Sequence, residues 1–81
     1  MRPTINAAIA DCLVRRYVEN ARTALERPDS MEAFDVRPYY AMRDAVTAGV
    51  ITGVAADYVR QVESGGFESG EQLLAVLTSR Y

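Results

Sequence analysis

The side chains that most often perform catalysis are scarce in this 81-residue chain, which has no histidine, no lysine and one cysteine, Cys12. Without histidine, neither a Ser-His-Asp nor a Cys-His arrangement can form, and zinc sites lose a principal ligand. Without lysine, there is no Schiff base and no phosphate-loop lysine. We expect Cys12 to be a buried, inert thiol, because free cysteine behaves as a small hydrophobic residue.

Carboxylates are the remaining candidates for acid–base chemistry. Glu32 and Asp35 lie close together in an irregular stretch, where active residues often occur. An acidic residue at a helix start is also what capping alone predicts. No metal-ligand spacing and no second nucleophile accompany the pair. The sequence therefore predicts a protein that is not an enzyme and that binds no cofactor and no metal.

A cluster of aromatic and basic residues is more informative: Arg37, Tyr39, Tyr40 and Arg43. Adjacent residues on a helix point about 100° apart, so an inward Tyr39 leaves Tyr40 outward, between the two arginines. Tyrosine and arginine are enriched where proteins bind tightly. We expect these four residues to form a contact surface for another protein. The alternative is that Tyr40 packs against the first helix with Arg37 over its ring.

Helical patterns account for most of the chain. Apolar spacing and end signals predict a long helix over 4–26 and shorter helices over 38–48, 53–64 and 70–80, with one further turn over 30–34. The fold class is all-α, a small four-helix array in a single helical domain that spans residues 1–81. The competing prediction for 45–51 is a strand, because this segment is β-branched and flanked by glycine.

Particular residues mark where these helices begin and end. Gly49 should stop the 38–48 helix, because glycine adopts a positive φ without penalty. Phe67 should fold over the first turn of the last helix as an apolar staple. The residues expected to cap or open helices are Thr4, Asp29 with Glu32, Pro38, Thr52, and Ser69 with Gln72.

The faces of the helices predict which side chains are buried. One half of the long helix is apolar, with Ile9, Ala10, Leu13, Val14, Tyr17, Val18, Ala21 and Leu25. Its opposite edge alternates in charge, which predicts a ladder of ion pairs worth roughly 0.2–0.5 kcal/mol each, formed by Asp11, Arg15, Glu19, Arg22 and Glu26. The inward stripes of the shorter helices are Tyr39, Met42 and Val46; Val54, Tyr58, Val59 and Val62; and Leu73, Leu74, Leu77 and Tyr81. Ile5, Ala8 and Cys12 lie off the main stripe, so a second element or a partner must cover them, and we expect a homodimer.

One segment carries a family resemblance. Its residues run Tyr58-Val59-Arg60-Gln61-Val62-Glu63-Ser64-Gly65-Gly66-Phe67-Glu68-Ser69 and are followed by Leu73 and Leu74. Residues 58–74 thus resemble ParD-type ribbon-helix-helix antitoxins, in which a helix ends in a V-x-S-G-x-[YF]-x-S turn. The resemblance implies a dimer that lays a two-stranded ribbon in the DNA major groove and binds a toxin through a separate tail. The ribbon would fall near 45–51, where the sequence has no arginine or lysine to contact bases or phosphates.

Charge and hydropathy narrow the class of function. Nine arginines against eleven acidic residues give a net charge of −2, which excludes a generally basic nucleic-acid coat. No apolar run approaches the roughly 18 residues of a membrane span and the N-terminus lacks a signal-peptide core, so we expect a cytoplasmic protein. The sequence predicts a small non-enzymatic regulator or inhibitor, like those of phages and mobile elements, that binds another protein. The alternative is a dimeric DNA-binding transcriptional regulator of the ribbon-helix-helix or helix-turn-helix type; Ala45, Gly49 and Val54 approximate the spacing of the latter.

Overall fold

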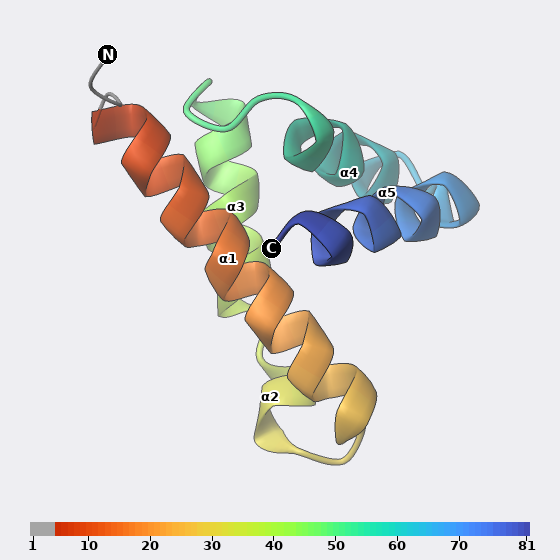
Figure 1. Ribbon diagram of the computed structural model, residues 1–81. Coiled ribbons are helices and arrows are strands. Elements are labelled where there is room, and N and C mark those ends of the chain that lie inside the picture. Colours follow the sequence, from red (N-terminus) through yellow and green to blue (C-terminus); the bar gives the residue numbers. More distant parts are fainter. Residues whose placement is uncertain (1–4) are drawn as a thin grey trace.

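The computed structural model describes residues 5–81, which form an all-α array (Figure 1). Its helices are α1 (Ile5–Glu26), α2 (Met31–Phe34), α3 (Arg37–Thr47), α4 (Val54–Glu63) and α5 (Phe67–Arg80). This confirms the predicted fold class, with one long N-terminal helix, three shorter ones, and the single turn α2 between them. Residues 5–81 contain no strand. The strand prediction for 45–51 was wrong, since α3 continues to Thr47 and a turn follows.

The helices form two layers that meet at the middle of α1. Helix α3 runs beside α1, α4 and α5 form a hairpin next to this pair, and α2 folds back against the far end of α1 (Figure 1). The end of α1 and α2 project beyond the rest, which fits the elongated dimensions of 42 × 24 × 22 Å. Within residues 5–81, no helix is both long and apolar enough to cross a membrane.

The core lies where α1, α3, α4 and α5 converge. Its largest fully buried side chains are Val18, Met42 and Leu77, one each from α1, α3 and α5. The inward stripes predicted for α3, α4 and α5 are confirmed, because all their members belong to or pack against this core. The stripe predicted for α1 was partly wrong, since Ile9 and Leu25 are exposed. The other helices leave Ile9, near the start of α1, and Leu25, near its end, open to solvent.

Helices α3 and α4 both end in a turn that depends on a glycine with positive φ. In α3, the positive φ of Gly49 (78°) lets Val50 N–H donate to the Ala45 carbonyl, while Gly49 N–H donates to Val46. In α4, Gly65 (φ 82°) has the equivalent bonds. These pairs of hydrogen bonds define Schellman motifs, which satisfy carbonyl groups that would otherwise lack a partner. Gly49 is thereby confirmed as the stop of α3.

Several helix starts differ from the sequence-based prediction. Ser30, not Asp29, caps α2, because the Ser30 hydroxyl accepts a hydrogen bond from the Ala33 N–H at 3.3 Å. Gly53, not Thr52, directly precedes α4, and its φ of 75° lies in the left-handed region that favours glycine. Helix α3 begins at Arg37, which places Pro38 second. The cap predicted at Thr4 lies outside the described residues.

Helix α5 begins three residues before the predicted start. The Gly65-Gly66 turn reverses the chain so quickly that Phe67 is already the first residue of the helix. Ser69 and Gln72 are therefore helical and cap nothing, contrary to prediction. The staple role of Phe67 was also wrong, because its side chain is 71% exposed.

An arginine of α1 fastens the end of α5. Arg22 donates from Nη2 to the Thr78 carbonyl at 2.6 Å and from Nη1 to the Tyr81 carbonyl at 3.1 Å. Of the predicted ladder, the described residues form the Asp11–Arg15 pair, at 2.6 Å. Arg22 instead donates to carbonyl groups at the end of α5 that lack an intrahelical partner, and its charge complements the negative end of that helix. This contact joins the two layers of the fold.

Candidate protein-binding surface

The exposed part of α3 presents a tyrosine with an arginine stacked on it. The Arg43 guanidinium carbon lies 4.5 Å from the centroid of the Tyr40 ring, and Tyr40 is 44% exposed. Arg43 also contacts Asp44 at 3.4 Å and Glu63 of α4 at 3.7 Å. The guanidinium is therefore held in place by two carboxylates and an aromatic face.

Arg37 does not stack on Tyr40, contrary to the alternative considered from the sequence. It forms a two-pronged ion pair with Asp35, with Nε and Nη2 at 2.8 and 2.9 Å from the two carboxylate oxygens. The Arg37 backbone N–H also donates to Asp35, at 3.1 Å. These bonds from Arg37 lower the pKa of Asp35 to about 2, far from the range of a general acid or base. The Asp35 carboxylate is thus occupied by contacts at the start of α3.

Tyr39 points inward and joins a cluster of tyrosine rings. Its ring centroid lies 6.0 Å from that of Tyr17, which in turn lies 5.6 Å from that of Tyr58. The hydroxyl groups of Tyr17 and Tyr58 share a hydrogen bond. Burial, and then this bond, raises the pKa of Tyr17 well above its ordinary value. Tyr40 packs edge-on against Tyr39, with centroids 5.8 Å apart, so the exposed ring is supported by a buried stack.

The Tyr39 hydroxyl is buried and has no hydrogen-bond partner among the described residues. The Glu63 carboxylate is near enough to disfavour a phenolate there, but it does not reach hydrogen-bonding geometry. Burial and this negative charge together raise the pKa of Tyr39 to about 12. The Tyr39 hydroxyl therefore stays neutral at physiological pH. The Tyr39 ring supports Tyr40 through the edge-on contact described above. We define Arg37, Tyr40 and Arg43 as the arginine–tyrosine face.

A groove of about 340 Å³ lies beside this face, between the second half of α1 and the start of α3. Leu25, Ala21 and Tyr17 line it from α1, and Val36 and Tyr40 line it from the opposite side. Its few polar groups include Asn20, whose side-chain amide donates to the Glu32 carbonyl at 3.0 Å and so ties α2 to α1. The groove is mainly apolar and opens beside the exposed Tyr40 ring.

The projecting end of the molecule carries four exposed apolar side chains, which we call the apolar tip. Leu25 is 75% exposed, Met31 87%, Phe34 75% and Val36 55%. The sequence-based prediction did not identify this surface. The sequence feature that could have predicted it is the short segment between Pro28 and Pro38. This segment has room for one helical turn, which has too few residues to bury Met31 and Phe34.

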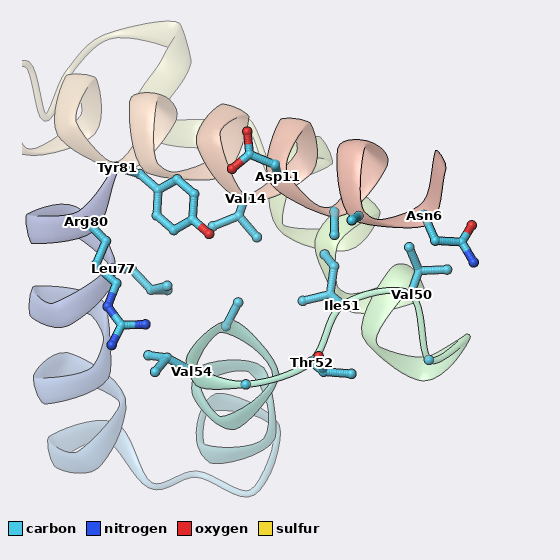
Figure 2. Close-up of a pocket in the computed structure, with 15 residues that line it drawn as sticks. Asn6, Asp11, Val14, Val50, Ile51, Thr52, Val54, Leu77, Arg80 and Tyr81 are labelled. Carbon is cyan, nitrogen blue, oxygen red and sulfur yellow. The ribbon is translucent and has the colours of Figure 1, made fainter. Parts of the chain in front are cut away.

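A second hollow, of about 460 Å³, lies at the opposite end, between the first half of α1, residues 49–55 and the end of α5 (Figure 2). Asp11 is its one carboxylate side chain, and Arg15 already binds it. The Arg15 guanidinium also lies 5.5 Å from the Tyr81 ring centroid. This hollow therefore offers no pair of carboxylates for acid–base chemistry.

Cys12 is exposed rather than buried, so that prediction was wrong. It lies on the side of α1 that α3 and α5 leave uncovered. Ile5 and Ala8, the other residues off the main stripe, are exposed as well. The described part of the chain therefore supplies no second element to cover this side.

Comparison with protein-family models, curated proteins and solved structures finds no match to this chain.

Proposed function

We propose that this chain is a small non-enzymatic regulator or inhibitor that acts by binding another protein through the arginine–tyrosine face. The observation that carries the proposal is the half-exposed Tyr40 ring, fixed between Arg43 and Tyr39 at 4.5 and 5.8 Å. Tyrosine and arginine are the residue types that dominate binding energy at protein interfaces. A side chain already held in place loses less conformational entropy on binding, which favours affinity.

The adjoining groove extends the same surface. It supplies apolar lining next to an exposed aromatic ring and a planar cation, which is the usual composition of an interface core with a polar rim. Arg37 and Arg43 lie on opposite sides of Tyr40 along α3, and each is oriented by a carboxylate. A partner therefore meets preorganised donors around one aromatic anchor.

The DNA-binding alternative has weaker support from the charges. On α4, Arg60 pairs with Asp57 at 3.3 Å, and Glu63 contacts Arg43. A phosphate group would have to compete with these carboxylates for each arginine. Residues 45–51, where the antitoxin-like ribbon would fall, are the end of α3 and a turn. These observations favour a protein partner over DNA.

The proposal is tested by affinity capture with a matched set of variants. Tyr40→Ala is expected to reduce capture of a specific protein from source-cell lysate by about 30-fold, the loss typical of an interface hot spot. Arg60→Ala is the matched control for Arg43→Ala, since both arginines pair with carboxylates but Arg60 lies on α4, away from Tyr40. The circular dichroism spectrum should be unchanged in all three.

Three results contradict the proposal. If all variants capture the same proteins as the wild type, the arginine–tyrosine face is not the contact surface. If the wild type instead retains random duplex DNA at low salt and releases it steeply as salt rises, the DNA-binding alternative is correct. Loss of helical signal in Tyr40→Ala would assign Tyr40 to the core.

A further inference from the structure

We infer that the apolar tip (Leu25, Met31, Phe34 and Val36) is a surface through which two copies of this chain pair. This goes beyond the proposed function, because it concerns a different partner and two anchors, Met31 and Phe34, that lie outside the arginine–tyrosine face. The two surfaces share the groove lined by Leu25 and Val36, and Arg37 borders both. The tip lies where α1 ends and α2 folds back, at the projecting end of the molecule (Figure 1). Helix α2 packs chiefly against α1, so the described residues leave the tip uncovered.

The exposed apolar area matches what a stable dimer needs. If each fully exposed side chain is given roughly 200 Å², the value of an aromatic ring and so an upper value for the other three, the four side chains offer at most roughly 600 Å². That is the upper end of the range for the largest apolar patch of a typical monomer, about 300–600 Å². Two such surfaces bury at most about 1,200 Å² together, and this upper value is above the threshold of about 1,000 Å² for a specific interface.

The charges around the tip favour a second copy over a strongly charged partner. The surrounding residues carry both signs: Glu26, Asp29 and Glu32 are acidic, and Arg27 and Arg37 are basic. Any partner with charges of one sign would place some of them against like charges. A twofold axis instead allows an arginine of each copy to face a carboxylate of the other, because the same surface is used twice.

The shape of the tip is also suited to twofold pairing. Phe34 projects from α2, and the apolar groove lined by Leu25 and Val36 lies beside it. Phe34 also lines a shallow hollow with Met31, and that hollow shares Asp35 with the groove. A projecting ring next to an apolar groove can be matched by the same pair on another copy, so that each ring enters the groove of its partner.

Sedimentation of the full chain over a wide concentration series tests the inference. The wild type is expected to approach twice the chain mass as concentration rises. Phe34→Ser should weaken association by at least about 30-fold, because it removes the largest anchor of the interface. Phe67→Ser is the matched control, since Phe67 is equally large and 71% exposed but lies on α5. It should leave association unchanged.

A cross-linking experiment places the two tips relative to each other. In a Cys12→Ser background, Met31→Cys should form a disulfide-linked dimer on mild oxidation. Ser69→Cys, exposed on α5, should not. The inference is overturned if the wild type stays monomeric at every concentration, or if Phe67→Ser disrupts the dimer as strongly as Phe34→Ser. It is also overturned if Ser69→Cys cross-links and Met31→Cys does not.

Another occupant of the tip gives a distinct result. If the chain is monomeric and Phe34→Ser abolishes capture of a different protein, the tip binds that protein and the pairing of copies is refuted. Failure of the proposed function is recognised separately, because it depends on Tyr40→Ala in the capture experiment. Either proposal can therefore fail while the other stands.

Discussion

Replacing Arg22 with methionine is expected to lower the free energy of unfolding by about 2 kcal/mol. Arg22 donates two hydrogen bonds to carbonyl groups at the end of α5, at 2.6 and 3.1 Å. Hydrogen bonds from charged groups contribute about 1.5–3 kcal/mol each when buried, and this pair is only partly buried. A cation at a helix C-terminus adds about 0.3–1 kcal/mol. Methionine keeps the apolar stem, so the loss reports mainly the guanidinium contacts.

Thermal and urea unfolding followed by circular dichroism measure this loss. For a chain of this size, about 2 kcal/mol corresponds to a fall in Tm of roughly 8–16 °C. Arg15→Met is the matched control, because Arg15 lies on the same helix and its ion pair with Asp11 is exposed. We expect it to cost much less than Arg22→Met, because exposed ion pairs contribute little to stability. Equal losses in the two variants would refute the stabilising contact between Arg22 and the end of α5.

Two further predictions concern the core and alkaline pH. Met42→Ala should lower the free energy of unfolding by about 2–5 kcal/mol, because the Met42 side chain is fully buried. Met31→Ala, measured in a dilute sample, should change the free energy of unfolding by less than about 0.5 kcal/mol, because Met31 is exposed. Equal effects of the two substitutions would place Met42 outside the core. The pKa values of Tyr17 and Tyr39 are higher in the folded chain than in the unfolded chain. Both tyrosines therefore stabilise the folded chain in full below about pH 10, where unfolded tyrosine titrates, and this contribution to the free energy of unfolding is lost as pH rises further. Tm should therefore fall above about pH 10, and the combined Tyr17→Phe and Tyr39→Phe substitutions should flatten that fall; an unchanged slope would show that other groups cause it.

The helices were predictable because their signals are local. Pro28 and Gly49 act on their own backbone, and the apolar spacing of each helix is set by its own geometry. The start of α5 was not predictable from the same signals. Ser69 has a capping side chain, but the Gly65-Gly66 turn lets the helix begin at Phe67, before any cap is reached. Backbone freedom at two adjacent glycines outweighed the preference of a side chain.

The arginine–tyrosine face was predictable in composition but not in detail. The spacing of Arg37, Tyr40 and Arg43 placed both arginines one turn from the ring, and gave no reason to choose between them. Helical side chains lean toward the N-terminus, so Arg43 reaches back over Tyr40 while Arg37 leans away from it. Asp35 then captures Arg37 at the start of α3. The choice follows from helix direction combined with one carboxylate.

The apolar tip is exposed because the segment between α1 and α3 is too short to bury its own apolar side chains. Ten residues separate Glu26 from Arg37, and they must leave α1, turn at Pro28 and enter α3 beside it. A segment this short forms one helical turn, and that turn is tied to α1 through Asn20, whose amide donates to the Glu32 carbonyl. With α2 held so close to α1, its own apolar side chains point away from the body, and no other described element reaches them. Exposed apolar area costs stability and solubility unless a partner covers it. The shortness of this segment therefore links the architecture of the chain to the proposed pairing, and lengthening the segment should weaken that pairing.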